Sequence, residues 1–96
     1  MKEKELTITE KQRKGLKILQ VIGKPICCKE LITKHKELVK EQGFDTERPN
    51  GINATLASVV MKELAKKEPI QYGDKILTHY SINEKGLAFL NKKENN

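Results

Sequence analysis

Four side chains in this sequence could bind a metal ion or change oxidation state: Cys27, Cys28, His35 and His79. Thiolates and imidazoles suit zinc and softer metals. The two cysteines are adjacent, however, and the chain has neither a Cys-x-x-Cys nor a His-x-x-x-His spacing. We therefore expect no metal site and no cofactor. The cysteines are expected to fill the start of a helix and His35 to lie on its apolar side; whether the cysteine pair senses redox state or metal stays open.

A second group of residues could contact the bases of DNA. No charged residue lies between Pro49 and Met61, in a chain that is 33% charged. A helix that enters the major groove needs small polar side chains, since asparagine can pair with adenine and threonine or valine can contact the thymine methyl. The candidate base-reading residues are Asn53, Thr55, Ser58 and Val59. Alternatively, this segment lacks charges because it is buried against the neighbouring loop or a second subunit.

The candidates for contacts to DNA phosphates are Arg48, Lys62, Lys66 and Lys75. Lys62 and Lys66 lie one helical turn apart on the expected helix, and Lys75 lies in a tight turn. Each has a simpler interpretation. The two helical lysines could form an ordinary solvated face, Arg48 could pair with Asp45 or Glu47, and Asp74 beside Lys75 would repel phosphate.

Composition narrows the function further. The 96 residues are expected to form a single domain (1–96) with an ordered core over about 9–90 and flexible charged termini. The net charge of +6 and a pI near 9.4 favour a polyanionic partner.

No phosphate-binding glycine loop, nucleophile elbow or carboxylate pair is present, so we expect no enzyme. No apolar run is long enough to cross a membrane, and the unpaired cysteines favour the cytoplasm, with nucleoid association when DNA is bound.

The expected elements follow from hydrophobic spacing and from capping and turn residues. A first helix starts after a capping box at Thr9 or Thr7 and stops at Gly23. Ile26 could form a short edge strand. A second helix covers 27–42, a loop covers 43–52, and a third helix covers 53–66. Strands at 70–72 and 76–82 flank the turn Gly73-Asp74, and Asn83 caps a last helix that ends near 90. The third helix is expected to bury Ala57, Val60, Met61 and Leu64.

This order resembles the winged helix-turn-helix regulators of the MarR and PadR type. The local matches are Leu64-Ala-Lys-Lys-Glu-Pro-Ile70 and Tyr80-Ser-Ile-Asn-Glu-Lys-Gly-Leu87, where the family shows Tyr-x-Leu-Thr-x-x-Gly. The resemblance covers residues 9–90 in outline. It implies a mainly helical α+β fold, with a three-helix core, a β-hairpin wing and a C-terminal helix.

The resulting hypothesis is a small transcription regulator that binds double-stranded DNA selectively. Helix 53–66 would enter the major groove, and the 72–76 wing would lie on the backbone. A homodimer through the first and last helices is expected, with Leu87, Phe89 and Leu90 as interface residues, and no small-molecule ligand is evident. The alternative is a winged-helix adaptor that binds another protein without reading DNA.

Overall fold

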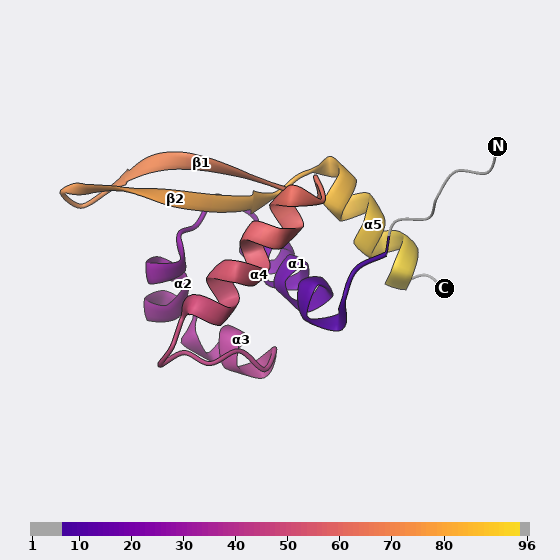
Figure 1. Ribbon diagram of the computed structural model, residues 1–96, viewed down its shortest axis with the longest axis horizontal. Coiled ribbons are helices and arrows are strands. Elements are labelled where there is room, and N and C mark those ends of the chain that lie inside the picture. Colours follow the sequence, from indigo (N-terminus) through magenta and orange to yellow (C-terminus); the bar gives the residue numbers. More distant parts are fainter. Residues whose placement is uncertain (1–6, 95–96) are drawn as a thin grey trace.

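The computed structural model describes residues 7–94, and its first element is helix α1, Glu10–Ile22 (Figure 1). The Thr9 hydroxyl accepts the backbone N–H of Gln12 at 3.0 Å, and the Gln12 side chain accepts the backbone N–H of Thr9 at 2.9 Å. Gly23 ends the helix with φ 70°, a conformation that glycine adopts without steric penalty. The capping box at Thr9 and the stop at Gly23 were both predicted and are confirmed.

Two short helices, α2 (Cys28–Lys34) and α3 (Lys36–Glu41), stand where the sequence predicted one. The chain leaves helical geometry at His35, with φ −128° and ψ 35°. Leu31 and Val39 are both fully buried, although they would point roughly 80° apart on a straight helix. The break allows each short helix to turn its own apolar residue into the core. His35 is half-buried at this junction rather than part of a continuous apolar stripe.

Helix α4, Asn50–Met61, lies earlier in the chain than the predicted helix 53–66 and buries a different side. Its buried residues are Ile52, Thr55, Leu56 and Val59. The expected core residue Met61 is 86% exposed, so the predicted core face is wrong for this helix. Pro69 does not end the helix either, because the chain turns at Glu63, whose φ is 63°, and continues directly into a strand.

The β-hairpin consists of β1 (Ala65–Tyr72) and β2 (Lys75–Ile82), which pair antiparallel along their whole length. Gly73 and Asp74 form its two-residue turn, and the positive φ of 64° at Gly73 alone fits a type II′ turn. The hairpin was predicted, but β1 begins at residue 65 rather than 70. Near the root, Ile26 and Tyr80 exchange two backbone hydrogen bonds of 2.9 and 2.8 Å, which confirms the short strand expected at Ile26.

Helix α5, Glu84–Glu94, follows the hairpin and packs against α1. The Asn83 side chain caps it by accepting the backbone N–H of Gly86 at 2.8 Å, as predicted. The helix continues beyond residue 90, into a tail that was expected to be flexible. Ile8, in the N-terminal segment expected to be flexible, packs against the core, whereas residues 1–6 and 95–96 lie outside the described part of the chain.

One hydrophobic cluster joins these elements, with α1 against α4 and the hairpin root above both (Figure 1). The contact between α1 and α4 is close at Gly15, where an added β-carbon would lie 2.9 Å from the Thr55 methyl carbon. The outer half of the hairpin projects past α2, away from α5 (Figure 1). Within residues 7–94, no helix has the length and apolar character needed to cross a membrane.

Candidate nucleic-acid interface

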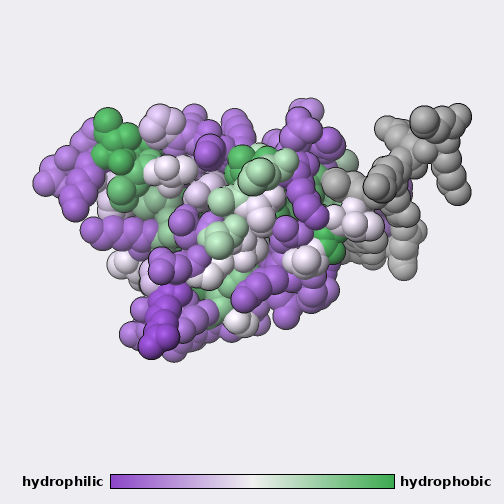
Figure 2. Space-filling view, in the orientation of Figure 1, coloured by the Kyte–Doolittle hydropathy of each residue, from purple (hydrophilic) through white to green (hydrophobic). Residues whose placement is uncertain are grey.

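The side of α4 that faces away from α1 forms an uncharged exposed surface. We call it the outer stripe; its residues, exposed or half-exposed, are Asn50, Asn53, Ala54, Ala57 and Met61. These positions lie within about 100° of one another around a helix. Figure 2 shows white and pale green atoms over part of α4, with hydrophilic purple atoms around them. The prediction of an accessible, charge-free helix surface therefore holds for this stripe.

Three of the four predicted base-reading residues lie elsewhere and need correction. Val59 is fully buried and Thr55 is 7% exposed. The Thr55 methyl faces Gly15 of α1, and its hydroxyl donates to the Gly51 carbonyl at 2.9 Å. Ser58 also faces α1, since its hydroxyl accepts from Gln12 at 3.0 Å and donates to the Thr55 carbonyl at 2.7 Å. The alternative interpretation, burial of an uncharged helix side, applies to these residues, with α1 as the covering element.

Asn53 is the predicted base-reading residue that remains exposed, and the structure orients its side chain. Its Oδ1 accepts from the Tyr80 hydroxyl at 3.2 Å and from the Cys28 thiol at 3.4 Å. Burial raises the pKa of the Cys28 thiol to about 11, with Cys27 as a second cause, and burial also raises the pKa of Tyr80. Both groups therefore stay protonated at neutral pH and act as donors. The Asn53 carboxamide is held with its NH₂ group available.

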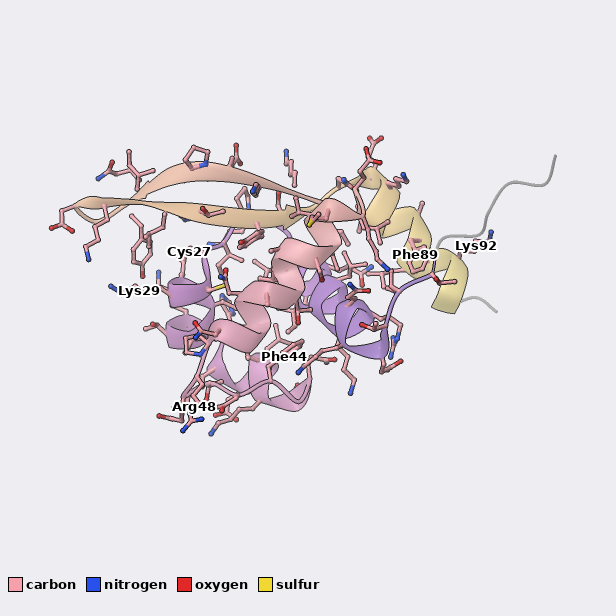
Figure 3. The ribbon with its side chains drawn as sticks, in the orientation of Figure 1. Cys27, Lys29, Phe44, Arg48, Phe89 and Lys92 are labelled. Atoms are coloured by element: carbon pink, nitrogen blue, oxygen red, sulfur yellow. The ribbon has the colours of Figure 1, made fainter. Side chains whose placement is uncertain are left out.

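A hollow of about 310 Å³ lies where α2, α4 and the hairpin meet. Asn53 lines it together with Lys75, a predicted phosphate contact, and with Lys29, which was not predicted. Both lysines are exposed, and Figure 3 places Lys29 on α2 below the hairpin. The rest of the lining is Cys27, Cys28, Leu77 and Thr78. The only sequence signal for Lys29 was its place in the first turn of a helix start, which gives no information about distant neighbours.

The other predicted phosphate contacts separate into different places. Arg48 is exposed just before α4 (Figure 3), and its backbone N–H donates to Asp45 Oδ1 at 3.2 Å. Lys62 lies at the far end of α4, where its ammonium donates to the Thr7 carbonyl at 2.6 Å. Lys66 is on β1 rather than on the helix. The helical pair Lys62–Lys66 expected from the sequence therefore does not exist.

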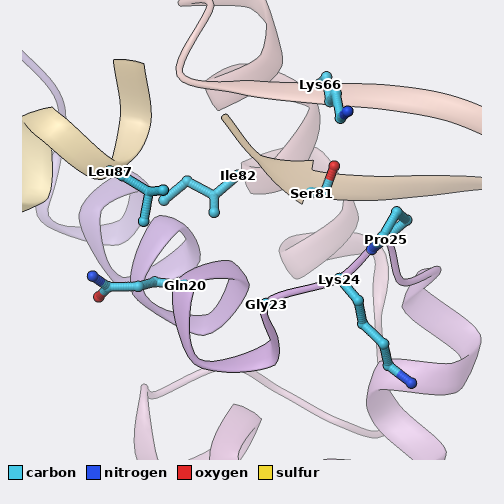
Figure 4. Close-up of a pocket in the computed structure, with 8 residues that line it drawn as sticks. All are labelled: Gln20, Gly23, Lys24, Pro25, Lys66, Ser81, Ile82 and Leu87. Carbon is cyan, nitrogen blue, oxygen red and sulfur yellow. The ribbon is translucent and has the colours of Figure 1, made fainter. Parts of the chain in front are cut away.

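Lys66 instead lines a second hollow, of about 300 Å³, at the root of the hairpin (Figure 4). The hydroxyl of Ser81 is buried beside it without a hydrogen-bond partner within the described residues. Leu87 of α5 closes one side, and Lys24 and Pro25 after α1 close another. This hollow shares no lining residue with the hollow around Asn53, so it is a separate feature.

One group of side chains within residues 7–94 has the composition of a metal site. The ligand atoms of Cys27, Glu30 and His79 all lie within 4.8 Å of one another. Cys27 and His79 are buried, at 2% and 4% exposed. No metal site was predicted from the sequence, because local spacing gives no sign that Cys27 meets His79, and Glu30 was not among the candidate ligands.

The structure is similar to a crystal structure of a PadR family transcription regulator from hypervirulent Clostridium difficile R20291. The TM-score is 0.66, the identity is 19%, and the match covers 91% of this chain and 85% of the other. This chain has a PadR-like winged helix-turn-helix fold. The fold predicted from the sequence is thus confirmed, and the hairpin is its wing. No model of a known protein family matches the sequence, and no curated protein matches it.

Proposed function

We propose that this protein binds double-stranded DNA through α4 and the wing and acts as a small transcription regulator. The observation that carries the proposal is the uncharged outer stripe of α4 with cationic side chains at its borders: Arg48 precedes the helix, and Lys29 and Lys75 share a hollow with Asn53. The likeness in fold to a transcription regulator supports the same conclusion.

The outer stripe suits the major groove, which is wide enough for one helix. Ala54 and Ala57 let the helix backbone approach the base edges, and their methyl groups can contact thymine methyls. The carboxamides of Asn50 and Asn53 could form hydrogen bonds with adenine, or with the edge of another base that has matching donors and acceptors. Without arginine on this stripe, we expect little guanine selectivity from α4.

Phosphate contacts would come from the borders of the stripe. The N-terminus of α4 has no side-chain cap and no acidic residue in its first turn, so its free N–H groups can bind a phosphate oxygen. Arg48 lies beside this end of the helix. Lys29 and Lys75 would hold the backbone on the wing side, and the exposed Asp74 reduces the net attraction there.

We further propose a homodimer through α1 and α5, working in the cytoplasm. Both helices carry exposed apolar side chains, Val21 at 60% and Leu87 at 37% exposure. Leu90, expected at the interface, is fully buried in its own chain and is left out. Sedimentation at micromolar concentration tests this point alone: a monomer would remove the dimer and leave DNA binding untouched.

The central test is a fluorescence-anisotropy titration of the full chain with a random-sequence duplex at several salt concentrations. Three cationic contacts predict a slope of log affinity against log salt of about −3. A measurable affinity at low salt that falls with this steepness supports the proposal, and the absence of binding at low salt contradicts it.

A protein partner is the second candidate function. Met61 is 86% exposed at the C-terminal end of the outer stripe, and flexible thioethers are common on surfaces that bind other proteins. If the duplex titration shows no affinity, the same stripe is best explained as the surface of an adaptor.

A further inference from the structure

We propose that Cys27, Glu30 and His79 form a binding site for a divalent metal ion of the zinc class, placed between α2 and the wing. The ligand atoms already lie within 4.8 Å of one another. In a tetrahedral zinc site, ligand atoms are separated by roughly 3.3–3.8 Å, given bond lengths of about 2.0–2.3 Å. Small rotations of the three side chains would therefore close the site.

Backbone pairing explains why Cys27 meets His79. Ile26 and Tyr80 are a hydrogen-bonded pair across an antiparallel bridge. Stepping one residue along each chain in opposite directions places Cys27 directly opposite His79, on the same side of the sheet. Side chains in such non-hydrogen-bonded pairs lie about 4.5–5.5 Å apart at their β-carbons. The approach of thiol and imidazole is thus a property of the fold and does not depend on one rotamer.

Glu30 reaches the same point from the first turn of α2. Cys27 is the N-cap of this helix, and its sulfur accepts the backbone N–H of Glu30 at 3.4 Å. A residue three positions after the cap points back toward it. Lys34 Nζ lies 3.3 Å from a Glu30 carboxylate oxygen, and this ion pair orients the carboxylate.

His79 is set up as a ligand by the hydrogen bond on its other nitrogen. Nδ1 lies 2.9 Å from the Leu77 carbonyl oxygen, and because a carbonyl can only accept, the proton belongs on Nδ1. With the proton on Nδ1, a metal ion would bind the lone pair of Nε2. Metal-binding histidines are held in the same way, by a donated hydrogen bond to a carbonyl or carboxylate.

The donor set selects the metal. One sulfur, one nitrogen and one carboxylate oxygen suit zinc better than the hard cations magnesium and calcium, which prefer oxygen alone. The Cys27 thiol loses its proton on binding. Cys27 also lines the hollow next to Asn53, so water can take the fourth position, as in zinc sites with three protein ligands.

Metal binding would fasten the wing to the helical body. Two of the ligands belong to the start of α2 and the third to β2, so the ion adds a link beside the backbone bridge between Ile26 and Tyr80. Figure 3 shows Cys27 below the hairpin, at this junction. Because the fold brings the three ligands together, the ion should bind the folded chain more tightly than the unfolded chain and raise its stability by mass action.

The test uses the full chain, reduced and stripped of metal with a chelator, and titrated with Co²⁺ and then Zn²⁺. The proposal predicts a one-to-one complex with a thiolate-to-cobalt charge-transfer band that Zn²⁺ abolishes. Cys27→Ser should remove the band. Glu30→Gln and His79→Gln should each weaken Zn²⁺ binding by more than about 100-fold, because the loss of a residue that merely supports a ligand already costs up to about 100-fold. The matched control is Cys28→Ser, which removes a thiol outside the cluster and should keep both band and affinity.

Two further measurements decide the result even if a variant fails to fold. X-ray absorption of the zinc-loaded wild-type chain should show one sulfur and otherwise nitrogen or oxygen ligands, and Zn²⁺ should raise its thermal midpoint. Two sulfur ligands, no cobalt–thiolate band in the wild type, or a band that survives Cys27→Ser would overturn the proposal. None of these measurements involves DNA, so the outcome is independent of the proposed regulator function.

Discussion

The α-carbon of Gly86 in α5 rests against the carbonyl group of Leu64, at the point where the chain leaves α4 for the wing. A β-carbon at position 86 would overlap the Leu64 carbonyl oxygen and press on the Ile82 side chain. The same carbonyl accepts the backbone N–H of Asn83 at 3.4 Å. The glycine of the Tyr80–Leu87 motif is therefore required by the contact between α5 and the start of β1.

Gly86→Ala is expected to lower the free energy of unfolding by about 1–3 kcal/mol, the usual range for overpacking a tight contact. Gly51→Ala is the matched control, because nothing lies within 4 Å of its β-carbon position. At the second residue of α4 that change should be neutral or stabilise by up to about 1 kcal/mol. Urea denaturation of both variants checks the pair; equal effects would show that the contact at Leu64 is not tight.

Glu63 is the one non-glycine residue with positive φ among residues 7–94. The left-handed conformation costs an ordinary residue about 1–2 kcal/mol. Glu63→Gly should therefore raise the free energy of unfolding by about 0.5–1 kcal/mol, after the greater freedom of glycine in the unfolded chain is subtracted. Glu84→Gly, the same change in the first turn of α5, should lower stability instead. A loss of stability in Glu63→Gly would mean that the turn is not strained.

Lys29 and Lys75 test the phosphate contacts on the wing side. Each alanine variant should weaken binding to all duplexes alike and reduce the salt slope by about one unit. Lys92→Ala, on the exposed end of α5 far from the wing (Figure 3), is the control with the same loss of charge. Anisotropy titrations across salt concentrations supply the slopes. If Lys92→Ala changes the slope as much as the other two, the attraction is general rather than local.

Ala57→Glu tests the outer stripe itself. Position 57 is half-exposed on α4, and glutamate is a good helix former, so the far-ultraviolet circular dichroism should not change. A carboxylate facing DNA should reduce duplex affinity by at least about tenfold, because like charges at an interface are strongly unfavourable. Lys92→Ala shifts the net charge by the same single unit and should not reproduce the loss. Full affinity in Ala57→Glu would exclude this face of α4 from the interface.

The sequence was most informative at positions where one residue type satisfies a particular backbone hydrogen bond or dihedral angle. The Thr9 capping box, the stop at Gly23, the Gly73-Asp74 turn and the Asn83 cap were all predicted and are present. Each depends on a few neighbouring residues whose hydrogen bonds or dihedral angles have few alternatives. These local signals, in their order, were enough to give the winged-helix fold.

The rotation of α4 could not be predicted in the same way. Its twelve residues include no charge, so more than one side of the helix is apolar enough to face the core. The side with Ala57 and Met61 is as suitable by composition as the side with Thr55 and Val59. What decided the matter was the close approach of Thr55 to Gly15 on α1, a contact between distant segments. Likewise, Lys66 favours a helix by local propensity, and pairing of β1 with β2 overrides that preference.

The proposed metal ligands illustrate the same limit. Cys27 and His79 are far apart in the sequence and become neighbours only through the bridge between Ile26 and Tyr80. Neither the adjacent cysteines nor the isolated histidine has a ligand spacing that a sequence pattern could reveal. Lys29 was missed for the same reason, because its approach to Asn53 depends on how α2 packs against α4.

Strand β1 forms an open edge of the sheet. It pairs with β2 on one side, and Ile26 pairs with the far side of β2. An unpaired edge of this length would normally invite strands from other molecules and lead to fibrous aggregates. Here the exposed segment reads Lys66-Lys67-Glu68-Pro69, in which charges repel incoming neighbours and proline withholds an N–H group. A long hairpin can therefore project into solvent at high protein concentration without recruiting further copies by edge-to-edge association.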